Sequence, residues 1–433
     1  MKLKTLLFCI ISLVICSQAP GQPKREQVRQ HILFSEIYIM PPVISADSTE
    51  VLYYIYKLPY DRLVFEKNNS LYTAAYRLTI EVHDSLTNTI NRKIKEGKIS
   101  ADDFEATDDD NIYTEGELDF QILKNKKYKI MPVLYDVNSG RELRLPAIPV
   151  LPRIEDNIQN GFLEPLILSS ASKENDNNSS FTLANFDGII PFSKAEYDLL
   201  IPSGDTALHK IYINIENKND TVFSDYVDES VLLRNFIEES NGEVVLTGGI
   251  SSKSYRNFLI PYINKNLAEG NYTISISLSK DSKPAATFHK KVFWFNKPAS
   301  LINPELAIKM LKYMESDTVI DSLLDFKRDE YSEVLFNYWK RFDPSPETAF
   351  NELMNEYYSR IDYSMKNFSS ISGRKGIDTD RGKIFILYGK PTETERSSNQ
   401  FGKVVETWVY KNPYRKFVFI DETGTGEYKL KNS

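Results

Sequence analysis

The sequence predicts a multidomain protein that is mainly β with a C-terminal α+β domain. We expect two immunoglobulin-like β-sandwiches, followed by a helical segment and a small antiparallel sheet. The chain has 433 residues, and at about 150 residues per domain this length suggests about three domains. Apolar residues recur with a period of two as far as residue 297 and with a helical period after Pro298. The 26 Tyr and 24 Phe also favour strands, because aromatic side chains suit a half-buried pleated surface.

Residues 1–21 have the form of a secretory signal peptide. Two lysines precede an apolar run, and Ala19-Pro20-Gly21 supplies small residues at a position suited to cleavage. The apolar run is too short to span a bilayer, which takes about 20 residues. We therefore expect an exported protein, periplasmic or at the cell surface or peripheral to the outer membrane, with no transmembrane segment in the mature chain.

Both cysteines, Cys9 and Cys16, fall within this signal segment. Cys16 is an alternative lipidation site, although Ile15 stands where a lipoprotein peptidase prefers a small residue. The mature chain would then contain no cysteine and no disulfide. The formal charge of −7 argues against a nucleic-acid partner, because such a partner needs a basic face.

The first β-sandwich is predicted at residues 31–153. Residues 51–56 are apolar on both parities, which is typical of a strand covered on both faces. In the polar insert at 90–110, we expect a helical turn at residues 91–97. Residues 71–84 show the clearest alternation, with one apolar face formed by Tyr76, Leu78, Ile80 and Val82.

The second β-sandwich is predicted at residues 160–297, after a linker at 151–157 in which proline and charges interrupt the strand pattern. Residues 211–216 and 272–279 alternate between apolar and polar side chains, as half-buried strands do. Residues 227–239 could form a short helix or an irregular crossing.

Residues 300–433 are predicted to form the C-terminal domain. Asn303-Pro304-Glu305 supplies a helix N-cap, a proline at the first helical position and an acid in the first turn. A second short helix is expected at 319–326. The longest helix is expected to begin at Ser345-Pro346-Glu347, with one apolar face that contains Phe350, Leu353, Met354, Tyr357, Ile361, Met365 and Phe368.

After Gly373 the period returns to two. Three strands are predicted, at 383–388, 404–411 and 415–421. Asn412-Pro413 is expected to form a tight hairpin between the last two. The tail at 424–430 is a candidate for a final short strand.

The spacings that mark common catalytic sites are absent from the sequence. It contains no P-loop, dinucleotide-binding glycine fingerprint, nucleophile elbow or zincin helix. The acidic run at 102–110 could bind Ca²⁺, but it lacks the glycine and the distal glutamate of a specific calcium loop. A solvated acidic loop is the favoured interpretation, so we predict no metal and no cofactor.

The most recognisable stretch runs from Gly376 to Pro391. Gly376 and Gly382 permit positive φ angles, and Thr379 and Asp380 can accept hydrogen bonds from backbone N–H groups in the turn. Two roles stay open, namely docking of the helices onto the sheet and a polar binding site at the rim of the sheet, where the Arg381 fork would face a carboxylate. The candidate binding residues are Gly376, Thr379, Asp380, Arg381, Gly382, Tyr388, Gly389 and Pro391.

At these residues the sequence resembles the GWxTD domain family, which is found in exported proteins of Bacteroidetes-like bacteria. The resemblance covers residues 300–433, and Ile377 stands where the family has Trp. If that Trp anchors a partner, the anchor is lost here. The resemblance implies export and an N-terminal accompaniment of sandwiches, but the family has no assigned biochemical activity. The matching positions are Gly376, Thr379, Asp380, 381–386, 388–391, 339–346, 355–360, 406–410 and 417–421.

These observations lead to one expected function and two alternatives. The expected function is that of a non-enzymatic periplasmic or cell-surface protein, which binds another envelope protein through its sandwich and GWxTD-like domains. One alternative is a polysaccharide-binding module, because surface aromatic side chains are common anchors of recognition surfaces. The other alternative is a hydrolase with an unrecognised carboxylate pair at a domain junction.

Overall fold

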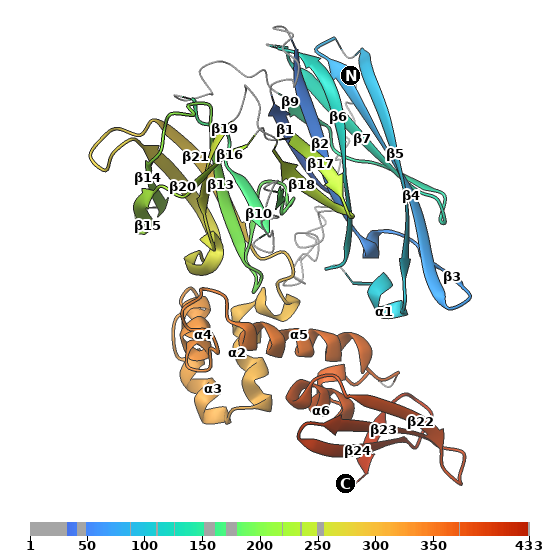
Figure 1. Cartoon of the computed structure of the whole chain (residues 1–433). Coiled ribbons are helices and arrows are strands. Elements are labelled where there is room, and N and C mark those ends of the chain that lie inside the picture. Colours follow the sequence, from blue (N-terminus) through green and yellow to red (C-terminus); the bar gives the residue numbers. More distant parts are fainter. Residues whose placement is uncertain are drawn as a thin grey trace, which may run out of the picture.

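The computed structural model describes residues 33–40, 49–86, 88–109, 111–124, 126–150, 161–169, 180–218, 220–233, 236–248, 255–371 and 373–431. The predicted signal peptide, both cysteines and the predicted linker at 151–157 lie outside these residues. Several antiparallel sheets and a few helices make up the described chain, so the protein is mainly β with a C-terminal α+β part (Figure 1).

Two antiparallel sheets face each other in the first part of the chain. Leu52, Tyr54 and Tyr56 of one sheet pack against Leu78 and Ile80 of the other. The first sheet contains β1 (Phe34–Met40), β2 (Thr49–Pro59) and β6 (Tyr113–Leu123). The second contains β3 (Glu66–Asn68), β4 (Leu71–Asp84), β5 (Thr89–Ala101), β7 (Tyr128–Asp136), β8 (Arg141–Arg144) and β9 (Ile148–Val150).

Strand β2 is covered on both faces, as its apolar residues on both parities predict. Tyr54 and Tyr56 point into the core of the first part. Tyr53 and Ile55 point the other way and pack against Leu200 and other apolar residues of the second part. Because β2 also packs against the second part of the chain, it has no polar face, although it belongs to a three-stranded sheet.

The helical turn predicted at residues 91–97 is wrong, because these residues lie within β5. This strand pairs with β4 from Thr89 to Ala101. Its residues are mostly exposed, so polar side chains fit there without disturbing the backbone ladder. A short helix, α1 (Phe104–Thr107), follows, and the Asp103 side chain caps it by accepting a hydrogen bond from Ala106 N at 2.8 Å.

The described residues of the second part of the chain form three sheets. The helix or irregular crossing predicted at 227–239 is replaced by the strands β16 (Ser230–Leu233) and β17 (Phe236–Ser240). The side chains of Leu233 and Ile237 in these strands pack in an apolar cluster. One sheet has the order β10 (Leu166–Ser169), β13 (Tyr197–Ser203), β19 (Tyr255–Ile260), β16. A second has the order β11 (Ser180–Thr182), β18 (Glu243–Thr247), β17. The third has the order β12 (Ile190–Pro191), β21 (Ala286–Phe293), β20 (Gly270–Ser277), β14 (Ile211–Asn217), β15 (Asp220–Val227).

Helices follow the last of these strands and lead into a four-stranded sheet. The Asn303 cap is confirmed, since its side chain accepts a hydrogen bond from Leu306 N at 3.1 Å. The helices are α2 (Pro304–Met310), α3 (Asp317–Leu324), α4 (Tyr331–Lys340), α5 (Glu352–Asn367) and α6 (Asp380–Tyr388). The sheet has the order β22 (Glu393–Ser398), β23 (Val404–Lys411), β24 (Tyr414–Asp421), β25 (Tyr428–Lys431), and Asn412-Pro413 connects β23 to β24 as predicted.

The longest helix begins later than predicted. Ser345 to Phe350 form turns, one of which is closed by a bond from Thr348 N to Ser345 O. Helix α5 starts at Glu352 because the Asn351 side chain accepts a hydrogen bond from Met354 N at 2.8 Å and so caps it. Asn351 is therefore the start signal that the sequence pattern obscured.

The predicted strand at residues 383–388 is wrong, because these residues form most of helix α6. The apolar residues of this run lie on two different faces of the helix. Ile386 packs with the helices and the second part, while Phe385 packs with the C-terminal sheet. Strand β22, which is exposed along its whole length, takes the place of the expected first strand.

The apolar core is continuous across the predicted boundary near residue 298. One cluster extends from Phe34 in β1 through the strands of the second part to Ile361 in α5 and Ile386 in α6. No helix among the described residues is long and apolar enough to cross a membrane.

Candidate functional site

The turn before α6 places Gly376 and Gly382 against backbone atoms. A Cβ atom on Gly376 would lie 1.8 Å from the carbonyl oxygen of Ser364, and one on Gly382 would lie 1.9 Å from the carbonyl oxygen of Gly376. Neither glycine has a positive φ, so the predicted reason for these glycines is wrong. They are needed because α5, the turn and α6 approach too closely for any side chain.

Thr379 accepts a hydrogen bond from a backbone N–H group of the turn, as predicted, whereas Asp380 accepts one from a strand of the sheet and not from the turn. Thr379 Oγ1 accepts from Gly382 N at 3.1 Å, which caps α6, and donates to Gly376 O at 2.7 Å. Asp380 accepts from Leu430 N of β25 at 3.0 Å. These bonds connect the turn to both the helix and the sheet.

Arg381 faces a carboxylate, and that carboxylate belongs to the same chain. Its Nη1 lies 3.3 Å from Oε2 of Glu406 on β23, and only 13% of each side chain is exposed. The guanidinium lies 3.8 Å from the ring centroid of Tyr428 and 5.1 Å from that of Phe368. The N–H donors and the planar face of the Arg381 guanidinium therefore both contact residues of the same domain.

The end of α6 is fixed by Arg360. Gly389 ends the helix with φ of 75°, and Arg360 donates to the last carbonyls, Ile386 O and Leu387 O, at 3.4 Å each. Tyr410 donates to Gly389 O at 2.9 Å.

The last two candidate residues, Tyr388 and Pro391, differ in their exposure. Tyr388 is partly exposed and packs against Tyr410 and Phe417, whereas Pro391 is half-buried.

Ile377 lies in the core, with 3% of its surface exposed. The position at which the GWxTD family has Trp is therefore a packing position in this chain. This observation argues against a partner anchor at residue 377. The predicted stretch joins the helices to the sheet, and the side chains of Thr379, Asp380 and Arg381 all contact groups of the same domain.

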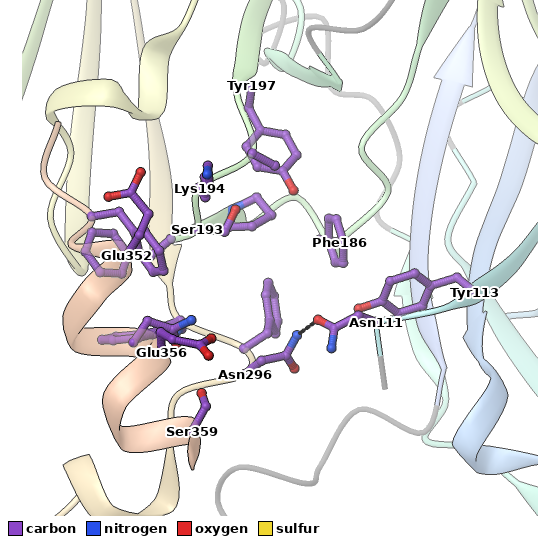
Figure 2. A pocket seen from close by; sticks show the side chains of 17 residues that line it. Asn111, Tyr113, Phe186, Ser193, Lys194, Tyr197, Asn296, Glu352, Glu356 and Ser359 are labelled. Carbon is purple, nitrogen blue, oxygen red and sulfur yellow. Dashed lines mark hydrogen bonds between the residues drawn. The ribbon is translucent and has the colours of Figure 1, made fainter. Parts of the chain in front are cut away.

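A second arrangement, the junction cleft, lies where the three parts of the chain meet. It has a volume of about 620 Å³. Figure 2 shows Glu352, Glu356 and Ser359 on one side, projecting from α5, and Tyr113 and Asn111 on the other. The cleft is lined by Asn111, Tyr113, Phe186, residues 191–195, Tyr197, residues 294–296, Phe350, Glu352, Asn355, Glu356 and Ser359.

One wall of the junction cleft is aromatic. Phe186 stacks on Phe295 with ring centroids 5.3 Å apart. Phe192 meets Trp294 at 5.3 Å and Phe350 at 5.2 Å, both edge to face. These contacts hold the rings in fixed positions, which suits them to serve as anchors for a bound group.

The other wall is a row of polar side chains on α5. Glu352, Asn355, Glu356 and Ser359 follow the i, i+3, i+4, i+7 spacing, which places them on one helix face. Glu352 accepts a hydrogen bond from Ser345 Oγ, and Glu356 pairs with Arg360 Nε at 2.6 Å. The wall thus offers carboxylate, amide and hydroxyl groups in a row about 10 Å long, given the rise of an α-helix.

A buried ion pair lies next to Phe186, one of the residues that line the junction cleft. Lys57 of β2 pairs with Glu115 of β6 at 2.9 Å and donates to Ala184 O of the second part at 2.6 Å. Its Nζ lies 4.0 Å from the centroid of the Phe186 ring, which lines the cleft. Burial raises the pKa of Glu115, and the nearby Lys57 opposes that rise. An Asn296–Asn111 hydrogen bond also connects the second part to the first (Figure 2).

The acidic run at 102–110 contributes to contacts between parts of the chain. Glu105 pairs with Lys390, and Asp108 pairs with Lys366 at 3.2 Å. Within the part of the chain that the structure describes, no group of three or more His, Cys, Asp or Glu side chains could hold a metal ion.

The sequence analysis did not identify the junction cleft. Its residues lie between positions 111 and 359, and no local spacing connects them. The polar row on α5 gave no signal either, because a polar face is the ordinary solvent-facing side of an amphipathic helix.

The fold and the site together define a mainly β protein that ends in a small α+β domain, with a cleft where its parts meet. Residues 270–433 match the family model of the GWxTD domain, the family that the sequence was predicted to resemble. The match begins at the first residue of β20, earlier than the predicted boundary at 300.

No curated protein matches the chain significantly. The solved structures to which the chain is weakly similar include the following two. Red sea bream transglutaminase shares 6% identity at a TM-score of 0.17, over 60% of this chain and 31% of that one. A structure named BspA_C_WT shares 8% identity at a TM-score of 0.13, over 59% of this chain and 97% of that one. Similarity at this level carries no argument about fold or function.

Proposed function

We propose that this is a non-enzymatic exported protein, periplasmic or at the cell surface, that binds another envelope protein. Its two immunoglobulin-like sandwiches and its GWxTD domain together form the binding surface, and an extended segment of the partner enters the junction cleft. The observation that supports this proposal is that all three parts of the chain contribute side chains to one cleft.

The two walls of the junction cleft suit an extended peptide. The oxygens of Glu352, Asn355 and Glu356 can accept hydrogen bonds from peptide N–H groups. The aromatic wall can take an apolar side chain of the same segment, as rigid aromatic anchors do at interfaces. The volume of about 620 Å³ is within the roughly 300–1,000 Å³ of typical ligand sites.

A hydrolase is the second candidate, because Glu352 and Glu356 line the same cleft one helical turn apart. Carboxylate pairs of glycosidases stand about 5–9.5 Å apart, and residues at this helical spacing have Cβ atoms about 5–6 Å apart, which makes such a separation accessible to their carboxylates. However, Glu356 is paired with Arg360, and Glu352 accepts from Ser345. These bonds favour a role in hydrogen bonding over one in proton transfer.

Replacement of Asn355 tests the proposal. Asn355→Arg places a long charged side chain in the cleft, whereas Asn337→Arg makes the same change at an exposed residue of α4 outside the cleft. We expect partners that co-purify with the native protein and with Asn337→Arg to be lost from Asn355→Arg, at an unchanged melting temperature. If Asn355→Arg retains every partner, the cleft is not the binding site.

A glycan array separates the polysaccharide alternative from the peptide proposal. The proposal predicts no glycan signal that depends on the junction cleft. A signal given by the native protein and by Asn337→Arg but lost in Asn355→Arg would replace the peptide with a polysaccharide.

A further inference from the structure

A second hollow lies on the first part of the chain, away from the junction cleft. Its volume is about 380 Å³, and it opens on the outer face of the sheet that contains β4, β5, β7 and β8. The inner face of this sheet forms the core of the first part, with Leu78 and Ile80 of β4 turned inward. The side chains that matter here are Arg77, Thr79, Arg92, Ile94, Tyr135 and Arg144.

Strand pairing places three arginines across this hollow. Arg77 of β4 lies opposite Tyr135 of β7, and its guanidinium stacks 4.8 Å from the centroid of that ring. Arg92 comes from β5 and Arg144 from β8, so the cations belong to three different strands. Neighbouring strands lie about 4.8 Å apart, which spaces the positive charges from one side of the hollow to the other.

The arginines are available to an external anion. Arg92 pairs with Glu81 at 3.7 Å, and Arg144 pairs with Glu142 at 3.3 Å. Both arginine side chains are more than half exposed. Such exposed ion pairs contribute little free energy to stability, so they rearrange easily. Among the described residues, no carboxylate lies within ion-pair distance of Arg77, although Glu96 lies opposite it on β5. The lining of the hollow contains three arginines and two glutamates, so it has one more cation than it has acids. This surplus stands out in a chain with a formal charge of −7.

The floor of the hollow combines a hydroxyl group with apolar side chains. Thr79 is buried, and Val133 and Ile94 lie opposite it on the two neighbouring strands. Half of the Ile94 surface is exposed. A sugar ring presents apolar C–H groups as well as hydroxyls, and this floor offers partners to both.

We propose that this hollow binds an acidic polysaccharide through its carboxylate or sulfate groups. The planar guanidinium fork pairs with such oxyanions through two parallel hydrogen bonds. Cations that recur from strand to strand suit a polymer that repeats its charges, which favours a polysaccharide over a single acidic side chain of a protein. This site is independent of the junction cleft and of the function proposed for it.

Affinity electrophoresis of the purified protein tests this proposal. The gels contain polygalacturonate, dextran sulfate, neutral dextran or polyglutamate. We expect polygalacturonate, dextran sulfate or both to retard the protein, with little effect from neutral dextran or polyglutamate. Retardation by one anionic polysaccharide alone identifies the preferred anion. Retardation by polyglutamate at equal strength would overturn the proposal in favour of an acidic protein partner, and retardation by neither polysaccharide would also overturn it.

Two arginine variants show whether the hollow is responsible. Arg77→Gln should weaken binding about tenfold, as expected for the loss of a charge-assisted hydrogen bond. Arg328→Gln, which removes the same charge from a side chain that is 84% exposed, should change binding less than twofold. Equal effects of the two changes would overturn the proposal, since binding would then follow net charge. The melting temperature of Arg77→Gln verifies that the sheet is intact.

Discussion

At the scale of single residues, the recognisable turn before α6 is built from close backbone contacts. Gly376 and Gly382 leave no room for a Cβ atom, and Thr379 and Asp380 use their side chains to satisfy backbone N–H groups. Arg381 connects α6 to Glu406 of the sheet. The features that make this stretch recognisable therefore have a sufficient structural explanation in this chain.

Gly376→Ala should destabilise the protein strongly. The new Cβ would meet a backbone oxygen at 1.8 Å, and backbone cannot move aside as a flexible side chain can. We expect a loss of about 3 kcal/mol or more in the free energy of unfolding, at the upper end of the cost of overpacking.

Urea unfolding measures this loss, and Gly204→Ala is the matched control. The nearest atom to a Cβ at Gly204 is 3.6 Å away, and its φ is not positive. The control should therefore change the free energy of unfolding by less than about 1 kcal/mol. If the two variants prove equally stable, the close-contact explanation of Gly376 is wrong.

At the scale of elements, the C-terminal domain shows what the sequence could and could not predict. The alternation in β4, the Asn303 cap and the Asn412-Pro413 hairpin depend on local patterns, and all three are confirmed. Residues 383–388 are apolar on both parities, a pattern that a buried strand and a helix buried on two sides share. Thr379, which caps α6, was the local evidence for a helix. This signal was hard to recognise because Thr379 is separated in the sequence from Phe385.

The junction cleft could not be predicted for a different reason. Its walls come from β-strand ends, loops and α5, and only tertiary packing brings these together. The candidate binding residues from 376 to 391 were identified because they form one continuous motif. A site assembled from distant segments leaves no such motif in one sequence.

A contact between α5 and the start of the helical segment should depend on pH. Asp362 of α5 accepts hydrogen bonds from the backbone N–H groups of Ala299 and Ser300, in the 3₁₀ turn Ala299–Leu301. Burial raises the pKa of the Asp362 carboxyl, and these hydrogen bonds oppose the rise. Because the folded protein holds this proton more tightly, the contribution of Asp362 to stability falls as pH rises from its ordinary pKa through the raised one.

Asp362→Asn removes this titration. The stability of the native protein relative to Asp362→Asn should therefore be greatest near pH 4 and decrease towards pH 7. Melting temperatures of both proteins across this range measure the difference. An advantage of the native protein that grows with pH would show that the carboxyl is stabilised in its charged form instead.

At the scale of the whole molecule, one continuous apolar cluster joins the three parts, and a hydrogen bond from Lys57 also connects the first part to the second. Lys57 reaches from the first part to Ala184 of the second and lies over Phe186 at the junction cleft. The shape of the cleft therefore depends on how the parts are held together. We therefore expect the proposed binding in the cleft to depend on domain packing through Phe186.

Lys57→Met should destabilise the protein by about 3–5 kcal/mol, because it leaves Glu115 buried without its cation. Lys57→Met combined with Glu115→Gln should recover much of this loss, since no buried charge is then unpaired. Urea unfolding of the three proteins measures both effects. A double variant no more stable than Lys57→Met would show that the contact of Lys57 with Ala184 and Phe186 matters more than the ion pair.

The proposed function requires that a segment of another envelope protein occupies the junction cleft. Photo-crosslinking in living cells can detect this contact, with a photoreactive benzoyl-phenylalanine at position 359 of α5 and, in a second protein, at position 337 of α4. Ser359 lines the cleft, and Asn337 is exposed elsewhere. We predict a crosslink from position 359 to one exported protein, mapped to a single segment of it, and none to that protein from position 337. The same adducts from both positions, or no protein adduct from position 359, would contradict the claim.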